Sequence, residues 1–170
     1  QLKTKRSDLN YKLIRGNVDT RIKKLEDGEY DAILLSKAGI DALGLNKKIS
    51  QEFTVDDLIP CAGQGIIAAQ CRDNDNEIRE ILEKINDEES RILANTEREV
   101  LKILEGDCDT AIGVYAKIEN EKINLKTELF SIDGKERYFI NESDKKNSFL
   151  SLGKNIGEQL KTKANGSYKR

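Results

Sequence analysis

The sequence has no histidine, no methionine, no tryptophan and a single proline, and only three of its 170 residues are cysteines. Three cysteines without histidine fit neither a paired disulfide framework nor a Cys/His zinc site. We therefore expect no metal site, and any role for Cys61, Cys71 or Cys108 should be that of a thiol. Because the chain begins at Gln1 and contains no methionine, we also expect it to be a fragment of a longer protein.

Long apolar stretches are missing as well. No segment approaches the roughly 20 apolar residues that a membrane helix needs, and no secretory signal is recognisable, so we expect a cytoplasmic protein without a membrane partner. The 29 basic and 31 acidic residues give a net charge of −2 and are spread along the chain, which indicates no nucleic-acid partner. With 37% hydrophobic residues, the chain can still build folded cores.

Apolar runs and helical spacing alternate in the first half of the chain. Runs at 11–14, 32–35 and 66–69 have the length of strands. Helical spacing follows the first run at Ile22 and Leu25, and Gly28 can end that helix. The alternation predicts an α/β part with a parallel or mixed sheet up to about residue 85. Within it, Pro60 opens a glycine-rich segment that suits a crossing between domains.

The second half of the chain predicts a small α+β domain. A helix should run between Asn86, as its N-cap, and Gly106, which is placed to end it. Three strands of an antiparallel meander are expected at 112–118, 122–130 and 137–140. A final helix at about 149–160 can cover one face of that sheet, and the tail 161–170 is expected to be frayed.

Arg15 and Arg21 frame the junction between an expected strand and the start of a helix. Free N–H groups at a helix start attract anions, and Gly16 would let a ligand come close to the main chain. Two guanidinium groups would add planar donors that match carboxylates. The alternative is that both arginines are solvated surface charges and that Asp19 only caps the helix.

Gln64 and Gly65 belong to a Gly-x-Gly turn where the backbone could approach a ligand. Such a turn is weak evidence, and the alternative is a structural hinge. Arg72, at an expected strand end, and Arg98, on the helix before Cys108, are equally open to two interpretations. Each is either a ligand-binding residue or an ordinary salt-bridge partner.

Cys108 lies between Asp107 and Asp109 just past a predicted helix end, where negative charge disfavours the thiolate. This setting is poor for a redox cysteine but compatible with one that is alkylated once and then holds the adduct. The alternative is an inert loop cysteine, and we interpret Cys61 and Cys71 as buried small hydrophobic residues. No pair of carboxylates stands out as a general acid and base.

Four motifs follow one another at defined spacing: LIRGNVDTR at 13–21, DGEYDAILL at 27–35, PCAGQG at 60–65 and EGDC at 105–108. Together with ANTER at 94–98 and IGVYA at 112–116, they resemble the porphobilinogen deaminase (hydroxymethylbilane synthase) family. The resemblance extends over nearly the whole chain and weakens only after about Lys145.

The resemblance implies a transferase of tetrapyrrole and heme biosynthesis. It would condense four porphobilinogen molecules stepwise, with release of ammonia, on a covalently bound dipyrromethane primer. Cys108 would hold this cofactor through a thioether. The residues that would bind the cofactor and the growing polypyrrole are Arg15, Arg21, Gln64 and Gly65. Arg72 and Arg98 match recurrent family arginines and are further candidates.

The family's first domain and its catalytic aspartate would lie before Gln1, so this chain should contain no catalytic residue and be inactive alone. The domains implied are 1–59, the second half of a periplasmic-binding-protein-like α/β domain; 60–85, a hinge crossing and return segment; and 86–170, the cofactor-attachment domain. The full-length protein would be a monomer. Ala42, where an arginine is usual, and Ala111, where proline is common, put one carboxylate contact and the stiffness of the cofactor loop in question.

Two other classes of function stay open. Two α/β lobes around a cleft also make hinged proteins that bind a small anion reversibly, and such a protein would carry no covalent adduct. Alternatively, the domain that begins near Asn86 is a structural or interaction module in which Cys108 is incidental.

Overall fold

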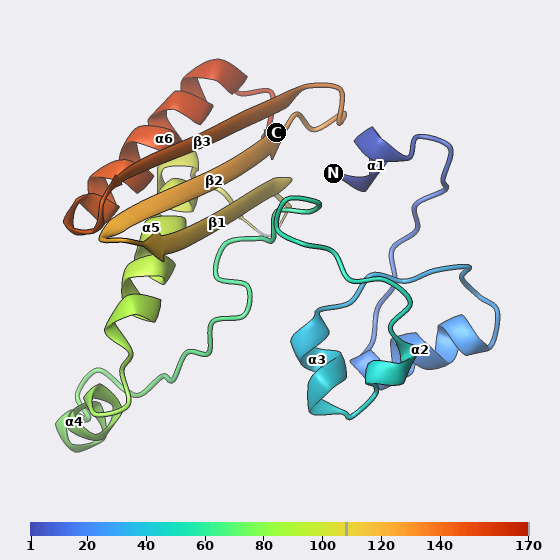
Figure 1. Cartoon of the computed structure of the whole chain (residues 1–170), viewed down its shortest axis with the longest axis horizontal. Helices are drawn as coiled ribbons and strands as arrows, with labels where there is room; N and C mark the ends of the chain where they lie inside the picture. The colour runs from blue at the N-terminus through green and yellow to red at the C-terminus, as the bar shows by residue number, and fades with distance from the viewer. Residues whose placement is uncertain (108, 170) are drawn as a thin grey trace. The chain divides into compact units, whose positions relative to one another are not determined.

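The structure of the protein is a computed structural model that describes residues 1–107 and 109–169. Figure 1 shows its helices and strands in chain order. The chain divides into two compact units, Gln1–Thr54 and Val55–Arg170, and each buries its own apolar side chains.

Three antiparallel strands in the order β1-β2-β3 form the sheet of the second unit. They are β1 (Ile112–Glu119), β2 (Lys122–Phe130) and β3 (Arg137–Lys145). Asn120 and Glu121 join β1 to β2 with positive φ angles of 49° and 59°, which suit the twist of a two-residue hairpin. The antiparallel meander predicted from the sequence is confirmed.

Two long helices, α5 (Glu88–Leu104) and α6 (Phe149–Ala164), pack against each other and against this sheet (Figure 1). The shared core contains Ile92, Val100, Leu104, Val114, Ala116, Ile123, Leu125, Leu129, Ile140, Leu152, Ile156, Leu160, Ala164 and Tyr168. Gly153 and Gly157 let α6 lie close to α5. A Cβ atom at Gly153 would be 2.6 Å from the carbonyl oxygen of Thr96. The helices α5 and α6 and the three strands thus enclose one apolar core.

Both ends of α5 differ by one residue from the prediction. Asp87, rather than Asn86, caps the start, because its carboxylate accepts a hydrogen bond at 2.7 Å from the N–H three residues later. Glu105, rather than Gly106, adopts the left-handed conformation that ends the helix, with φ 54° and ψ 35°. The N–H of Gly106 then bonds to the carbonyl of Leu101 at 2.9 Å, as in a Schellman ending. Sequence patterns place helix ends only to within a residue or two.

Residues 161–169 pack against the core of the second unit, so the expectation of a frayed tail is wrong for them. Tyr168 is 3% exposed and belongs to the core. The carbonyl of Ser167 accepts a hydrogen bond from the N–H of Ile132 at 2.8 Å. The prediction of a frayed tail rested on the position of these residues near the end of the sequence. The buried ring of Tyr168 anchors them instead.

The first unit is built from short helices. They are α1 (Leu2–Lys5), α2 (Val18–Glu26), α3 (Lys37–Ala42) and the 3-10 turn η1 (Asn46–Lys48). The second unit also contains α4 (Asn76–Glu83) and the 3-10 turn η2 (Lys146–Ser148). Gly28 follows α2 with φ 79°, which confirms the predicted helix end.

Within the described ranges, no helix is both long enough and apolar enough to cross a membrane.

The expected strands at 11–14, 32–35 and 66–69 do not form in the part of the chain that the structure describes. A strand is held by hydrogen bonds to a neighbouring strand, and these segments pair with none of β1 to β3. Their exposed apolar side chains include Leu13 (78%), Leu34 (54%) and Ile67 (97%). Local spacing identifies residues that suit a strand, but it does not show whether a partner strand is present.

Candidate functional site

The start of α2 is folded around the side chain of Arg21. The Nε atom of Arg21 donates a hydrogen bond to the carbonyl of Gly16 at 2.7 Å. Gly16 has φ 123°, and a Cβ atom there would lie 2.9 Å from the side chain of Thr20, so this tight loop requires glycine. The guanidinium of Arg21 is thereby oriented by the loop that precedes its own helix.

Arg15 lies at the same loop with an exposed guanidinium that has no ion-pair partner among the described residues. The ammonium of Lys24 is 3.4 Å from the carbonyl oxygen of Arg15, which adds a further cation. Asn17 occupies the N-cap position but makes no side-chain capping bond. Asp19 lies inside the first turn, where its carboxylate accepts the N–H of Thr20 at 2.8 Å. The loop therefore presents cations and helix N–H groups, a combination that suits an anion.

A buried carboxylate fixes the turn that contains Gln64. Glu97, on α5, is 5% exposed and accepts hydrogen bonds from the N–H of Gly63 at 2.7 Å and from the N–H of Ala116 at 2.8 Å. Burial raises the pKa of Glu97, and the two N–H bonds oppose that shift. One side chain thus joins the turn, α5 and β1.

Gln64 itself is exposed, and its side-chain carbonyl accepts a hydrogen bond from the thiol of Cys61 at 3.3 Å. Gly63 and Gly65 on either side have φ angles of 76° and 83°. These left-handed conformations favour glycine and keep both sides of the turn free of side chains. The turn can therefore offer the amide of Gln64 and its neighbouring backbone to a ligand.

Glu97 was missed by the sequence reasoning, although a signal for it exists. It lies on the buried side of α5, four residues after Leu93 and three before Val100. A carboxylate on the apolar face of a helix needs hydrogen-bond donors, because burying an unpaired charge is costly. A buried Glu97 therefore requires hydrogen-bond donors, and in the structure these are the N–H groups of Gly63 and Ala116.

The other candidate arginines are in different settings. Arg72 precedes α4 and forms an ion pair with Asp75 at 2.8 Å, which supports the salt-bridge interpretation. Arg98 is exposed on α5 and has no ion pair in the described residues.

Cys61 is exposed and Cys71 is half-buried, so their interpretation as buried hydrophobic residues is wrong. Cys71 follows the segment 66–69, which does not form the expected strand, and Cys61 lies in the exposed glycine-rich turn.

Cys108 lies outside the described residues, but its neighbours form a compact turn. The N–H of Asp107 donates to the hydroxyl of Thr110 at 3.0 Å, and the N–H of Asp109 donates to the carboxylate of Asp107 at 2.9 Å. The N–H of Thr110 in turn donates to the carbonyl of Asp107 at 3.2 Å. The carboxylate of Asp107 is therefore occupied by donors of its own loop.

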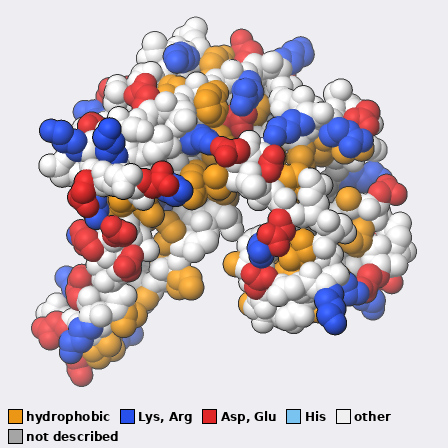
Figure 2. Space-filling view, in the orientation of Figure 1, with side chains coloured by type: hydrophobic (Ala, Val, Ile, Leu, Met, Phe, Trp, Pro, Cys, Tyr) orange, Lys and Arg blue, Asp and Glu red, His pale blue; other side chains and the backbone are white. Residues whose placement is uncertain are grey.

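Charges of both signs are interspersed over the face drawn in Figure 2. Hydrophobic side chains are exposed along α4, where Ile78 and Ile81 are 41% and 49% exposed. In the described residues, no group of three or more Cys, Asp or Glu residues is arranged to hold a metal ion. The candidate residues thus fall into separate groups. The first unit contains the loop of Arg15 and Arg21, and the second unit contains the turn fixed by Glu97 and the described neighbours of Cys108.

Comparisons with known proteins relate both halves of the chain to one family. Residues 1–80 match the family model described as "Porphobilinogen deaminase, dipyromethane cofactor binding domain". Residues 91–162 match the model described as "Porphobilinogen deaminase, C-terminal domain". The two matches follow each other without overlap and include every residue of the candidate site.

Curated relatives carry the same name. A probable porphobilinogen deaminase of Nitrosopumilus maritimus is 40% identical over 163 residues, which are 96% of this chain and 52% of that protein. The porphobilinogen deaminase of Fusobacterium nucleatum is 39% identical over 95% of this chain and 54% of its own length. That of Francisella tularensis subsp. novicida is 38% identical over 99% and 55%. The chain spans about half the length of the curated relatives it matches.

Proposed function

The chain belongs to the porphobilinogen deaminase family, and on this premise we propose that the full-length protein is a hydroxymethylbilane synthase. It joins four porphobilinogen molecules stepwise, with release of ammonia, and then releases the linear product by hydrolysis. The observation that carries the proposal is that the candidate residues fall within both family matches. Arg15 and Arg21 lie in the cofactor-binding match, and Cys108 lies in the C-terminal match.

The proposed cofactor is a dipyrromethane held through a thioether to Cys108. Its pyrroles carry carboxylates, so the residues that hold it should be cations and N–H donors. The arginine loop fits this requirement, because the guanidinium of Arg15 is exposed and the guanidinium of Arg21 is oriented by Gly16. When bound, the dipyrromethane would supply the terminal pyrrole to which the first porphobilinogen is joined, and each later unit would be joined to the growing chain.

The residues of this chain bind and orient in the proposed reaction. Arg15 and Arg21 bind acetate and propionate groups, while Gln64 and Gly65 bind through an amide and exposed backbone. Arg98 is a further candidate because its guanidinium is exposed and has no ion pair in the described part of the chain. Arg72 is a weaker candidate, since Asp75 already neutralises it.

The proposal extends to the organisation of the full-length protein. Residues 1–59 complete a periplasmic-binding-protein-like α/β lobe, 60–85 cross the hinge and return to the first domain, and 86–170 attach the cofactor. Exposed apolar side chains in the three unpaired segments support this, because they suit strands that pair with residues outside this chain. The proposed enzyme is a cytoplasmic monomer whose catalytic aspartate lies outside residues 1–170.

Turnover by the full-length protein tests this function. We expect porphobilinogen to be consumed with release of one ammonia per molecule, and hydroxymethylbilane to accumulate. Calorimetry with porphobilinogen on the same sample separates the alternatives, because a hinged anion-binding protein would bind reversibly without turnover. That result would reject the proposed enzyme.

A further inference from the structure

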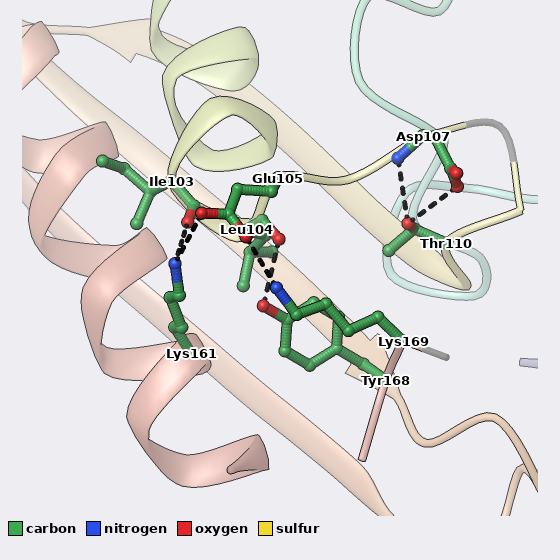
Figure 3. Close-up of polar contacts among 8 residues, drawn as sticks. All are labelled: Ile103, Leu104, Glu105, Asp107, Thr110, Lys161, Tyr168 and Lys169. Atoms are coloured by element: carbon green, nitrogen blue, oxygen red, sulfur yellow. Dashed lines mark hydrogen bonds and ion pairs between the residues drawn. The ribbon is translucent and has the colours of Figure 1, made fainter. Parts of the chain in front are cut away.

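The last carbonyl groups of α5 are bonded by side chains from the C-terminal residues of the chain (Figure 3). A helix leaves its final carbonyls without partners, so they need donors from elsewhere. The ammonium of Lys161 donates to the carbonyl of Ile103 at 3.2 Å, and the hydroxyl of Tyr168 donates to the carbonyl of Leu104 at 3.0 Å. The end of α5 is therefore held by groups that lie far away in the sequence.

Glu105 is bonded by the same C-terminal residues. It adopts the left-handed conformation, which is unfavourable for a residue with a Cβ atom. Its carboxylate forms ion pairs with Lys169 at 2.6 Å and with Lys161 at 3.3 Å (Figure 3). Hydrogen bonds from these two lysines, that of Lys169 first, lower the pKa of Glu105. Two cations thus favour the backbone conformation that turns the chain out of α5.

The C-terminal residues are themselves firmly anchored. Tyr168 is 3% exposed and packs in the core. The backbone of Ser167 bonds to the N–H of Ile132, and its hydroxyl lies 3.2 Å from the hydroxyl of Tyr138. A segment fixed to the core and to the turn after β2 can hold the end of α5 in one position.

The loop that leaves α5 has its other anchor on the sheet. The N–H of Phe130, at the end of β2, donates to the carbonyl of Ala111 at 3.0 Å. Between the two anchors, the bonds of Asp107 with Asp109 and Thr110 close the turn locally. The position of this turn therefore depends on how firmly α5 is held at Glu105.

We propose that Lys161, Tyr168 and Lys169 form a C-terminal clamp that positions the described neighbours of Cys108, which are Gly106, Asp107, Asp109 and Thr110. Through them the clamp would position the cofactor that we propose Cys108 to carry. This inference rests on the proposed function. The clamp residues are positioning residues, because their described contacts are with the end of α5 and with Glu105. Loss of the clamp should consequently lower kcat, the turnover rate with substrate bound, and leave the KM for porphobilinogen largely unchanged.

The test uses the full-length protein and three variants. The double variant Tyr168→Phe/Lys169→Ala removes the hydroxyl and one ion pair but keeps the buried ring. Lys169→Arg keeps the positive charge beside Glu105. Lys163→Ala is the control, because it removes an exposed lysine of α6, the helix that carries Lys161, and Lys163 has no ion pair among the described residues. Intact mass, amide hydrogen exchange of residues 106–110 and steady-state kinetics are measured on each.

We expect the adduct on every variant. In the double variant, exchange in 106–110 should be faster by roughly fivefold to tenfold. Its kcat per adduct-bearing molecule should fall about tenfold with KM unchanged. Lys169→Arg and Lys163→Ala should behave like the unmodified protein. Unchanged exchange and kcat in the double variant, or an effect on KM alone, would overturn the clamp.

Two further outcomes remain decisive. If the double variant does not fold, the single Tyr168→Phe variant, which keeps the ring in the core, is tested by the same exchange measurement. If the unmodified protein carries no adduct, the proposed function fails. The exchange of residues 106–110 still decides whether the clamp holds the loop.

Discussion

At the scale of single residues, the burial of Glu97 links the protonation of one carboxylate to the stability of the fold. It is buried between two backbone N–H groups, one in the turn 60–65 and one in β1. Its negative charge has lost its hydration, and this loss raises the pKa of the carboxyl above its ordinary value of 4.5. Stability should therefore depend on the protonation of this one group.

The sign of that dependence follows from comparing the folded and unfolded states. Below pH 4.5, Glu97 is protonated in both states, so it adds no pH-dependent term. As the pH rises through the raised pKa, the unfolded state releases the proton more easily, and the folded state loses relative stability. We expect the free energy of unfolding of the chain to fall, relative to that of Glu97→Gln, over this range.

Urea unfolding of both proteins at a series of pH values measures this difference. The relative loss should begin near pH 4.5 and level off once Glu97 is ionised in the folded state as well. The difference in the free energy of unfolding could instead be constant with pH, or favour the unmodified chain as pH rises. Either result would show that burial does not raise the pKa of Glu97 in the folded state.

Arg15 and Arg21 are predicted to bind carboxylates of the cofactor and the growing chain. In the full-length enzyme, Arg15→Ala and Arg21→Ala should each weaken chain elongation by about 1.5 to 3 kcal/mol, because a bound carboxylate loses a charge-assisted hydrogen bond. Single-turnover kinetics with porphobilinogen measures this loss. Lys23→Ala is a matched control on the exposed side of α2, and its kinetics should match those of the unmodified enzyme. Unchanged kinetics in both arginine variants would refute the assignment.

At the scale of elements, the sequence predicted well those helices and strands whose signals lie within one short segment. The strand expected at 122–130 has the bounds of β2, because alternation and a two-residue turn are both local signals. The strand expected at 137–140 continues to Lys145 as β3. Its second half is polar, as is usual at a sheet edge, so apolar alternation did not reveal it.

Interactions between distant segments could not be predicted in the same way. Arg15, Gly16 and Arg21 are close in the sequence, and their loop was identified as a candidate site. The bond from Gly63 to Glu97 spans 34 residues, and the ion pair of Glu105 with Lys169 spans 64. Neither pair carries a local pattern, because it forms only when the core brings the two segments together.

The contact between α5 and α6 gives a prediction about packing. An exposed glycine in a helix is usually stabilised by replacement with alanine, by about 0.5 to 1 kcal/mol. At Gly153 we expect the opposite, a loss of roughly 1 to 3 kcal/mol, because the added Cβ atom would lie 2.6 Å from a backbone oxygen of α5.

Thermal or urea unfolding of Gly153→Ala measures this loss. Asn155→Ala, at an exposed position of the same helix, is the control and should be neutral or slightly stabilising. An equal gain in stability in both variants would contradict the close packing of α6 on α5.

At the scale of the whole molecule, the candidate binding residues occur in both compact units of the chain. The family relation covers both units, while the relatives are about twice as long as this chain. Three segments with strand-like sequences stay unpaired, and the proposed enzyme pairs them with residues outside the chain. The cofactor is thus proposed for the full-length protein, with Cys108 as its attachment point.

Intact-mass analysis of the full-length protein, with peptide mapping around Cys108, tests this attachment. We predict a dipyrromethane adduct that maps to Cys108 and gives a positive Ehrlich reaction, and its absence from Cys108→Ser. A full-length protein that carried no adduct after incubation with porphobilinogen would contradict the proposed function. An adduct that persisted in Cys108→Ser would contradict the assignment of Cys108.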